Sequence, residues 1–282
     1  MLYMVATPIG NLDDISNRAL EVLKKVDLIA AEDTRVSKVL LSKFGISTKL
    51  ISLHKFNERD RANEIIDKII AEDIDVAYIS DAGTPAVSDP GAILARIAWE
   101  KGVVVSPVPG ASAVVSALSI SGFLSNEFTF YGFLPRKKGE ITEALLEYSK
   151  RSKIGVFYES PHRVIELMEI ATGLFKDCDM LLCCDLTKLY EKSLRGKPKE
   201  ILENLLSNPK AEKGEYCLLI DFSNIEPQEK SEEISLEARL FDCVLKGKSL
   251  KEAIKILSND GFKKNELYEA SLRLKSLLKS DI

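Results

Sequence analysis

Short apolar runs alternate with amphipathic helical patterns through the first half of the chain. Apolar runs bounded by turn residues indicate buried strands, and a 3.6-residue periodicity between them indicates helices that cover a sheet. We therefore expect repeated strand–helix units and a mostly parallel sheet. The expected strands are residues 2–6, 27–31, 49–53, 75–79 and 103–108, and the expected helices are residues 15–26, 36–44, 63–71 and 92–101.

The second half repeats this style and then becomes purely helical. Its expected strands are residues 127–133, 153–158, 179–186 and 215–222, and its expected helices are 141–150 and 164–173. Ser249 has the character of an N-cap for a helix at 250–257, and Gly261 that of a terminator before a helix at 264–278. We expect two α/β domains, residues 1–121 and 122–224, and a small helix-turn-helix-like module, residues 232–282.

Composition and cysteine usage indicate a globular protein of the cytoplasm. The 282 residues are 45% hydrophobic and 29% charged, which is enough apolar material for two cores. The five cysteines form no CxxC pair, so we expect reduced core residues, and the first ten residues lack the pattern of a signal peptide. Two separate histidines are too few for a zinc site, and no metal is expected.

One uncharged stretch, residues 102–126, is long enough to span a bilayer. Pro107, Pro109, Gly110 and several serines interrupt it. A buried strand, a tight turn and a buried helix fit this pattern better than a membrane span.

The net charge of −4 argues against a protein that coats nucleic acid nonspecifically. The charge is unevenly distributed, however. Residues 236–282 contain ten Lys and Arg against seven Asp and Glu, a balance of +3, whereas residues 225–233 are acidic and polar. This asymmetry is compatible with a nucleic-acid partner for the helical module.

Ligands of open α/β sheets bind at the carboxyl ends of the parallel strands, so the loops after the expected strands are the candidate site. Five consecutive loops are rich in Gly, Pro and small polar residues: residues 6–11, 32–35, 54–58, 80–91 and 107–113. None contains GxxxxGK[ST] or GxGxxG, which excludes the usual phosphate-binding loops. Glycines beside prolines and small residues suit a mainly apolar ligand held by backbone groups.

Charged residues in these loops permit two interpretations. Asp33 or Thr34 could begin the following helix as its N-cap, or the segment could position a substrate through the Arg35 guanidinium. Asp81 and Asp89 could accept hydrogen bonds from a ligand, or Asp89 could cap a helix that begins at Pro90.

The second half has its own candidate charges. Residues 158–163 place Glu159, His162 and Arg163 at a strand tip, which favours a functional role. Two basic stretches, residues 136–138 and 188–199, are interpreted either as solvated surface or as contacts to an RNA backbone beside the cleft.

Together, several of these motifs resemble the tetrapyrrole methylase superfamily, in its branch that methylates small-subunit ribosomal RNA. The motifs are residues 2–3, 6–12, 30–35, 80–85, 88–91, 158–163 and 263–268, and the resemblance extends over almost the whole chain. It implies two α/β domains with S-adenosyl-L-methionine bound in the cleft between them. It also implies 2′-O-methylation of a cytidine ribose in the decoding region of 16S rRNA within the 30S subunit, by a cytoplasmic homodimer.

The resemblance assigns cofactor contacts by position. They are Pro8, Asp81, Ala82, Gly83, Thr84, Val87, Ser112, Ala113, Tyr158 and Glu159. Two positions depart from the family pattern: Phe56 stands where a second histidine is common, and Cys184 stands where an arginine is common.

Transfer to a ribose hydroxyl requires alignment and help with proton loss. We expect Asp33 and Arg35 to orient the RNA, and Glu159 or Lys188 to assist proton loss. The alternatives are a relative that methylates a small tetrapyrrole, and a noncatalytic ribosome-assembly factor that binds RNA through its helical module.

Overall fold

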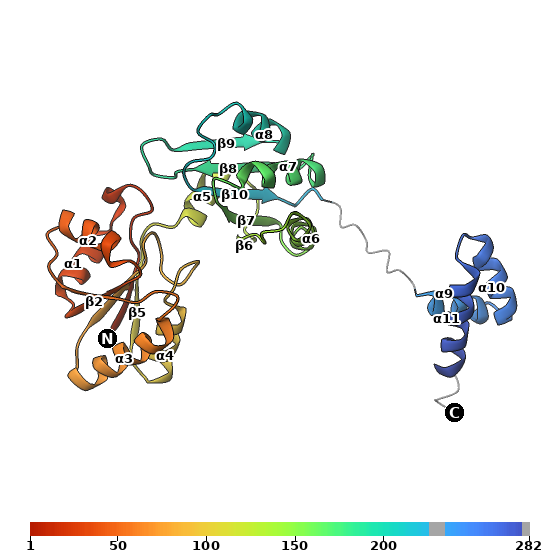
Figure 1. Ribbon diagram of the computed structural model, residues 1–282, viewed down its shortest axis with the longest axis horizontal. Coiled ribbons are helices and arrows are strands. Elements are labelled where there is room, and N and C mark those ends of the chain that lie inside the picture. The colour runs from red at the N-terminus through yellow and green to blue at the C-terminus, as the bar shows by residue number, and fades with distance from the viewer. Residues whose placement is uncertain (226–234, 278–282) are drawn as a thin grey trace. The chain divides into compact units, whose positions relative to one another are not determined.

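The computed structural model describes residues 1–225 and 235–277 (Figure 1). It divides the chain into two compact units, Met1–Asn224 and Ile225–Ile282, which are described separately below. The acidic stretch expected at residues 225–233 lies almost entirely outside the described residues. The start of the expected helical module at 232 and the helix end at 278 lie outside them as well.

The first sheet of the larger unit is fully parallel. Its strands are β1 (Leu2–Val5), β2 (Leu28–Ala31), β3 (Lys49–Ser52), β4 (Val76–Ile79) and β5 (Val105–Val108). They lie in the order β3-β2-β4-β1-β5, and every neighbouring pair runs in the same direction. The parallel sheet expected from the apolar runs is therefore confirmed for this half.

Helices cover both faces of this sheet. Helices α1 (Asn17–Lys25) and α2 (Thr34–Lys43) pack on one face, where Leu23 and Leu41 meet Ile29. Helices α3 (Glu58–Glu72) and α4 (Ala92–Glu100) pack on the other, where Ile66 and Leu94 meet Tyr78 and other strand residues. The central strands are apolar at successive positions because both of their faces are buried.

Strands β1 and β4 are neighbours whose following connections leave toward opposite edges of the sheet. Such a switch point opens a crevice at the carboxyl ends of the strands. Here the two loops are joined directly: Thr7 N donates to Gly83 O at 2.9 Å, and Gly83 N donates to Thr7 O at 3.1 Å. A short 3-10 turn (Leu12–Asp14) follows the β1 loop.

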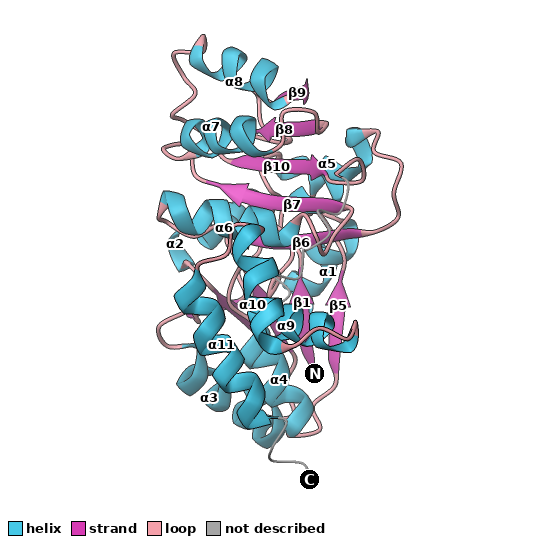
Figure 2. Ribbon diagram, turned by 90° about the vertical axis from the view of Figure 1, so that its right-hand side faces the viewer, coloured by secondary structure: helices cyan, strands magenta, loops and turns pink. Residues whose placement is uncertain are grey.

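The second sheet is mixed rather than parallel (Figure 2). Its strands are β6 (Phe128–Phe133), β7 (Ile154–Glu159), β8 (Met180–Cys184), β9 (Lys192–Gly196) and β10 (Tyr216–Asp221). They lie in the order β6-β7-β10-β8-β9; β6 and β7 are parallel, and the other three pairs are antiparallel. The expectation of a mostly parallel sheet is wrong for this half, because local patterns do not specify strand direction.

Helices also flank the second sheet. On one face, α5 (Ala113–Ser121) packs Val114 and Ala117 against Val156 and Leu219. On the other, Tyr148 of α6 (Lys138–Tyr148) stacks on Tyr131 of β6 with ring centroids 3.8 Å apart. Helix α7 (Val164–Leu174) packs against α6 and against α8 (Pro198–Leu206).

The uncharged stretch at 102–126 forms a strand (β5), a turn and a helix (α5), as expected. The expected burial is wrong for most of it, because β5 is an edge strand and α5 buries only Val114, Ala117 and Ser121. Across the two ranges that the structure describes, no helix combines the length and apolarity that crossing a membrane requires. All five cysteines are free thiols, and Cys178, Cys183 and Cys217 are buried.

The smaller unit contains α9 (Leu236–Leu245), α10 (Leu250–Asn259) and α11 (Lys264–Leu277). These helices share a core that includes Leu240, Leu257 and Leu267. Ser249 caps α10 as expected, and its side chain and Glu252 form a reciprocal capping box.

Candidate functional site

A cavity of about 360 Å³ lies where the loops of the first sheet meet the strand ends of the second. The first sheet contributes the loops after β1 and β4, and the start of α5 closes the same wall. The second sheet contributes the ends of β6, β7 and β8 and the beginning of β10. On the first side the lining residues are Ile9, Ala82, Gly83, Thr84, Val87, Ser88, Asp89, Ser112 and Ala113.

The loop after β4 is shaped by its backbone. Gly83 has a φ of +79°, and a Cβ there would lie 3.2 Å from Cγ2 of Ile9. Thr84 Oγ1 donates to Ala111 O at 3.2 Å, which ties this loop to the segment before α5. Glycine is favoured at Gly83 because the left-handed conformation and the close approach both disfavour a side chain.

The opposite wall depends on the antiparallel pairing of β10. Tyr216 at its start pairs with Glu159 at the end of β7 and with Cys184 at the end of β8. Residues from three strands therefore meet at one edge. The lining residues on this side are Phe133, Tyr158, Glu159, Ser160, Pro161, Cys183, Leu186, Glu215, Tyr216 and Cys217.

Glu159 has a side chain that is fully buried. Its Oε1 accepts a hydrogen bond from Ser160 N at 2.7 Å, and its Oε2 lies 3.2 Å from an Arg163 nitrogen. Oε2 has no partner in hydrogen-bond geometry within the described part of the chain. Burial raises the pKa of Glu159, although Ser160 and Arg163 act in the opposite direction. The cavity edge thus carries a carboxyl group that is ion-paired with Arg163, has one oxygen without a hydrogen bond in the described residues, and has an increased affinity for a proton.

A second group of carboxyls gathers at the ends of β2 and β4. Burial is the main cause that raises the pKa values of Glu32, Asp81 and Asp89, and repulsion from a neighbouring carboxylate adds to it in each case. Asp81 N donates to Glu32 Oε2 at 3.4 Å, and Asp81 Oδ1 accepts from Asp33 N at 3.0 Å. Asp89 lines the cavity, so this acidic group extends to its rim.

The half-buried Asp33 and the exposed Arg35 form an ion pair outside the cavity lining. Asp33 Oδ1 accepts from Arg35 N at 2.8 Å, which confirms the interpretation of Asp33 as the N-cap of α2. Its Oδ2 also lies 2.6 Å from the Arg35 guanidinium, whose side chain is 89% exposed. Hydrogen bonds from the Arg35 side chain and backbone lower the pKa of Asp33 to about 2.

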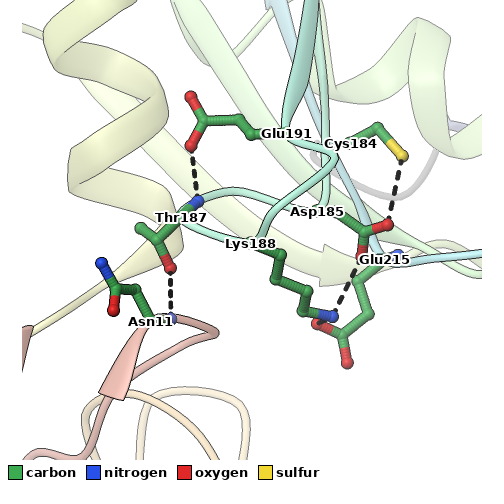
Figure 3. A network of polar contacts seen from close by, with 7 residues as sticks. All are labelled: Asn11, Cys184, Asp185, Thr187, Lys188, Glu191 and Glu215. Atoms are coloured by element: carbon green, nitrogen blue, oxygen red, sulfur yellow. Dashed lines mark hydrogen bonds and ion pairs between the residues drawn. The ribbon is translucent and has the colours of Figure 1, made fainter. Parts of the chain in front are cut away.

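Lys188 lies between two carboxylates (Figure 3). Its Nζ is 3.0 Å from Asp185 Oδ1 and 2.9 Å from Glu215 Oε2. Burial alone would lower the pKa of Lys188, but the hydrogen bonds to Glu215 and Asp185 raise it. Lys188 is therefore held as a cation beside Glu215, one of the residues that line the cavity.

The interpretation of Asp89 as the cap of the following helix is wrong. Helix α4 begins at Ala92, and Glu58 satisfies its first amides: Oε1 accepts from Gly91 N at 2.8 Å and from Ile93 N at 3.0 Å. In the same segment, Asn57 Oδ1 accepts from His54 N at 2.8 Å. The polar loop at 54–58 thus has a structural task, and Asp89 is left facing the cavity.

Eight of the ten expected cofactor residues line the cavity: Ala82, Gly83, Thr84, Val87, Ser112, Ala113, Tyr158 and Glu159. Pro8 and Asp81 are outside the lining, next to residues that belong to it. Of the expected catalytic residues, Glu159 lines the cavity, whereas Asp33, Arg35 and Lys188 do not.

The lining residues at the start of β10 could not be predicted from the sequence. A parallel strand would place Glu215 at the edge opposite to Glu159, so the antiparallel pairing was needed to find them. Across residues 1–225 and 235–277, the structure contains no group of three or more His, Cys, Asp or Glu side chains arranged to hold a metal ion.

Comparison with known proteins extends these observations. Residues 1–202 match the family model of tetrapyrrole (corrin/porphyrin) methylases. The chain is 41% identical to ribosomal RNA small subunit methyltransferase I of Halalkalibacterium halodurans, covering 95% of this chain and 93% of that protein. It is 38% identical to the protein of the same name from Bacillus subtilis, covering 96% and 93%.

Solved structures show the same fold at low identity. A cobalt precorrin-4 methyltransferase of cobalamin biosynthesis superposes with a TM-score of 0.57 at 19% identity, covering 79% of this chain and 95% of that one. A diphthine synthase superposes with a TM-score of 0.58 at 14% identity, covering 78% and 88%. The chain therefore belongs to the tetrapyrrole methylase family and, within it, to the ribosomal RNA small subunit methyltransferases I.

Proposed function

We propose that this protein transfers a methyl group from S-adenosyl-L-methionine to the ribose 2′-hydroxyl of a cytidine in the decoding region of 16S rRNA, within the 30S subunit. The observation that carries the proposal is the convergence of eight expected cofactor residues on one cavity between the two sheets. The near-complete match to relatives named as rRNA methyltransferases supports an RNA substrate over a small tetrapyrrole.

The cavity suits this cofactor in size and chemistry. About 360 Å³ lies in the range of small-molecule sites, and the lining is mainly apolar with a few polar groups. Backbone groups around Gly83 and Ala113 would hold the cofactor, and Oε2 of Glu159, which forms no hydrogen bond with the described residues, would accept one from the cofactor or from the ribose. When bound, S-adenosyl-L-methionine supplies a methyl group activated by its positively charged sulfur.

Glu159 is our candidate for proton acceptance. A ribose hydroxyl is a weak nucleophile, and a base is most useful when its pKa lies near the working pH. Burial shifts the pKa of Glu159 in that direction. Lys188 is unsuited to the same task because its two carboxylate partners keep it protonated; we assign it an electrostatic role instead.

RNA contacts are proposed for charged groups outside the cavity. The exposed guanidinium of Arg35, oriented by Asp33, would approach a phosphate. In the helical unit, Lys251 and Lys255 are exposed one turn apart on α10 and form no ion pair with the described residues. We further propose that the protein works in the cytoplasm as a homodimer, as the family resemblance implies.

Incubation of unmethylated 30S subunits with tritiated S-adenosyl-L-methionine tests the proposal. We expect label in 16S rRNA with the wild-type protein and a rate lower by about two orders of magnitude with Glu159→Gln, the usual effect of losing a proton acceptor. In a parallel reaction with a tetrapyrrole in place of the 30S subunits, label in the tetrapyrrole together with unlabelled rRNA would identify a small-molecule methyltransferase. Binding of 30S subunits without any transfer would identify an assembly factor.

A further inference from the structure

Thr187 adopts a backbone conformation that its side chain disfavours. Its φ is +66°, in the left-handed region, where β-branched residues are rare. Asp185, two residues earlier, also has a positive φ of +50°. Such conformations persist where the surroundings enforce them, and they concentrate at functional sites.

Several contacts enforce this conformation (Figure 3). Thr187 N donates to Glu191 Oε2 at 2.6 Å, and Asp185 N donates to Glu215 O at 2.9 Å. The Asp185 carboxylate also accepts from Lys188 Nζ at 3.0 Å. Gly214 leaves room for that carboxylate, because a Cβ there would lie 2.5 Å from Asp185 Oδ2. The turn after β8 is thus fixed from both ends.

The strained turn presents the Thr187 hydroxyl to the first domain. Thr187 Oγ1 accepts a hydrogen bond from Asn11 N at 3.0 Å, across 176 positions of sequence. Gly10 allows the approach, because a Cβ there would lie 2.9 Å from Thr187 Oγ1 and 2.5 Å from Lys188 Cγ. The loop after β1 therefore rests directly on the turn after β8.

The residues next to this contact belong to the cavity. Ile9 and Leu186 both line it, one from each domain. Ile9 is two positions from Asn11, and Leu186 is next to Thr187. The Asn11–Thr187 hydrogen bond therefore holds together the two loops that carry these cavity side chains.

We propose that Thr187 is a positioning residue whose hydroxyl holds the two domains in register at the wall of the cofactor cavity. The unfavourable conformation is retained because it aims the hydroxyl at Asn11. The inference rests on the proposed function in so far as S-adenosyl-L-methionine is taken as the ligand of the cavity.

Three substitutions distinguish the effect of the Thr187 hydroxyl from the effect of the strained backbone. Thr187→Ser keeps the hydroxyl; Thr187→Val keeps the branched shape without it; Thr187→Gly removes both the hydroxyl and the strain. Thr129→Val, at an exposed position of β6, is the matched control. The measurements are amide hydrogen exchange at Asn11 without cofactor, the dissociation constant of S-adenosylhomocysteine, and the thermal midpoint.

We expect Thr187→Val to accelerate exchange at Asn11 and to weaken cofactor-product binding about fivefold, as the loss of one hydrogen bond predicts. KM for S-adenosyl-L-methionine should rise while kcat changes little. Thr187→Ser should behave as wild type. Thr187→Gly should lose affinity as Thr187→Val does. It should nevertheless unfold at a higher temperature than Thr187→Val, because glycine relieves the backbone strain at this position.

Wild-type exchange and affinity in Thr187→Val would overturn the proposal. So would a Thr187→Ser variant as impaired as Thr187→Val, or affinity losses that simply follow the thermal midpoint. Failure of the wild-type protein to bind S-adenosylhomocysteine, with exchange at Asn11 still dependent on the hydroxyl, would instead refute the proposed function and the cofactor role of the contact.

Discussion

The Glu159 carboxylate lies 3.2 Å from the guanidinium of Arg163, and the side chain of Glu159 is fully buried at the edge of the cavity. Arg163 also donates to the backbone carbonyl groups of Leu134 and Pro135, which come directly after β6. Arg163 therefore serves two purposes. It balances a buried negative charge, and it ties the end of β7 to the neighbouring strand.

Replacing Arg163 by alanine should destabilise the protein strongly. Removing one partner of a buried ion pair leaves an uncompensated charge, and we expect a loss of about 3 kcal/mol in the free energy of unfolding. Urea denaturation of the variant and of the wild-type protein measures this loss of free energy. Arg151→Ala is the control, because Arg151 and Glu147 form an exposed ion pair four positions apart, for which about 0.5 kcal/mol is expected. Equal effects of the two substitutions would show that the burial of Glu159 has no energetic consequence.

Gly83→Ala should impair ligand binding beyond its effect on stability. The alanine would be strained at a φ of +79°, and its Cβ would press on Ile9 inside the cavity. Gly45→Ala is the matched control, with a φ of +62° and nothing within 4 Å of the added carbon. Both should lose about 1 to 2 kcal/mol of stability. Calorimetric titration with S-adenosylhomocysteine should show weaker binding for Gly83→Ala alone; equal affinities would remove Gly83 from the site.

Stability should depend on pH through Glu32. Burial, and then the charge of Asp89, raise its pKa above the ordinary value of 4.5. The folded protein thus holds this proton more tightly than the unfolded chain, so the stabilisation is complete below 4.5 and is lost as the pH rises through the raised pKa. Glu32→Gln should therefore be more stable than wild type at pH 7 and similar to it near pH 4.5. Denaturation curves of both proteins between pH 4.5 and pH 7 test this expectation. A difference in the free energy of unfolding that does not vary with pH would contradict it.

The cations of α10 should contribute to RNA affinity and not to cofactor affinity. Substituting Lys251 and Lys255 by glutamine should reduce the slope of log affinity against log salt by about 1.5, the value expected for two lost phosphate contacts. Filter binding to 30S subunits at several salt concentrations measures this slope. Lys246→Gln is the control because Lys246 is already paired with Asp242 at 2.7 Å. An unchanged slope in the double variant would place the RNA contacts elsewhere.

The positions of the strands of the first sheet and of the helices that cover it could be predicted because local patterns encode them. Strands such as β4, Val76–Ile79, are buried on both faces and are therefore apolar throughout. Strand β9, Lys192–Gly196, was missed because it is a polar edge strand, exposed or half-buried along its length. In the sequence it is indistinguishable from a solvated basic stretch, and α8 behind it was missed with it.

The candidate site was predictable where it consists of loops after strands. Ala82 to Thr84 and Ser112 lie in such loops, and they line the cavity. Glu215 and Cys217 lie at the beginning of a strand, and their place in the cavity follows from the antiparallel direction of β10. The contact between Asn11 and Thr187 joins positions 176 residues apart, which no local pattern in one sequence reveals.

The most direct test of the account is the chemical position of the transferred methyl group. After reaction of 30S subunits with tritiated S-adenosyl-L-methionine, the 16S rRNA is hydrolysed in alkali, which cleaves only next to a free 2′-hydroxyl. We predict label in an alkali-resistant dinucleotide that yields 2′-O-methylcytidine on enzymatic digestion. Label in mononucleotides would indicate methylation of a base, and it would contradict ribose transfer, as would an unlabelled rRNA.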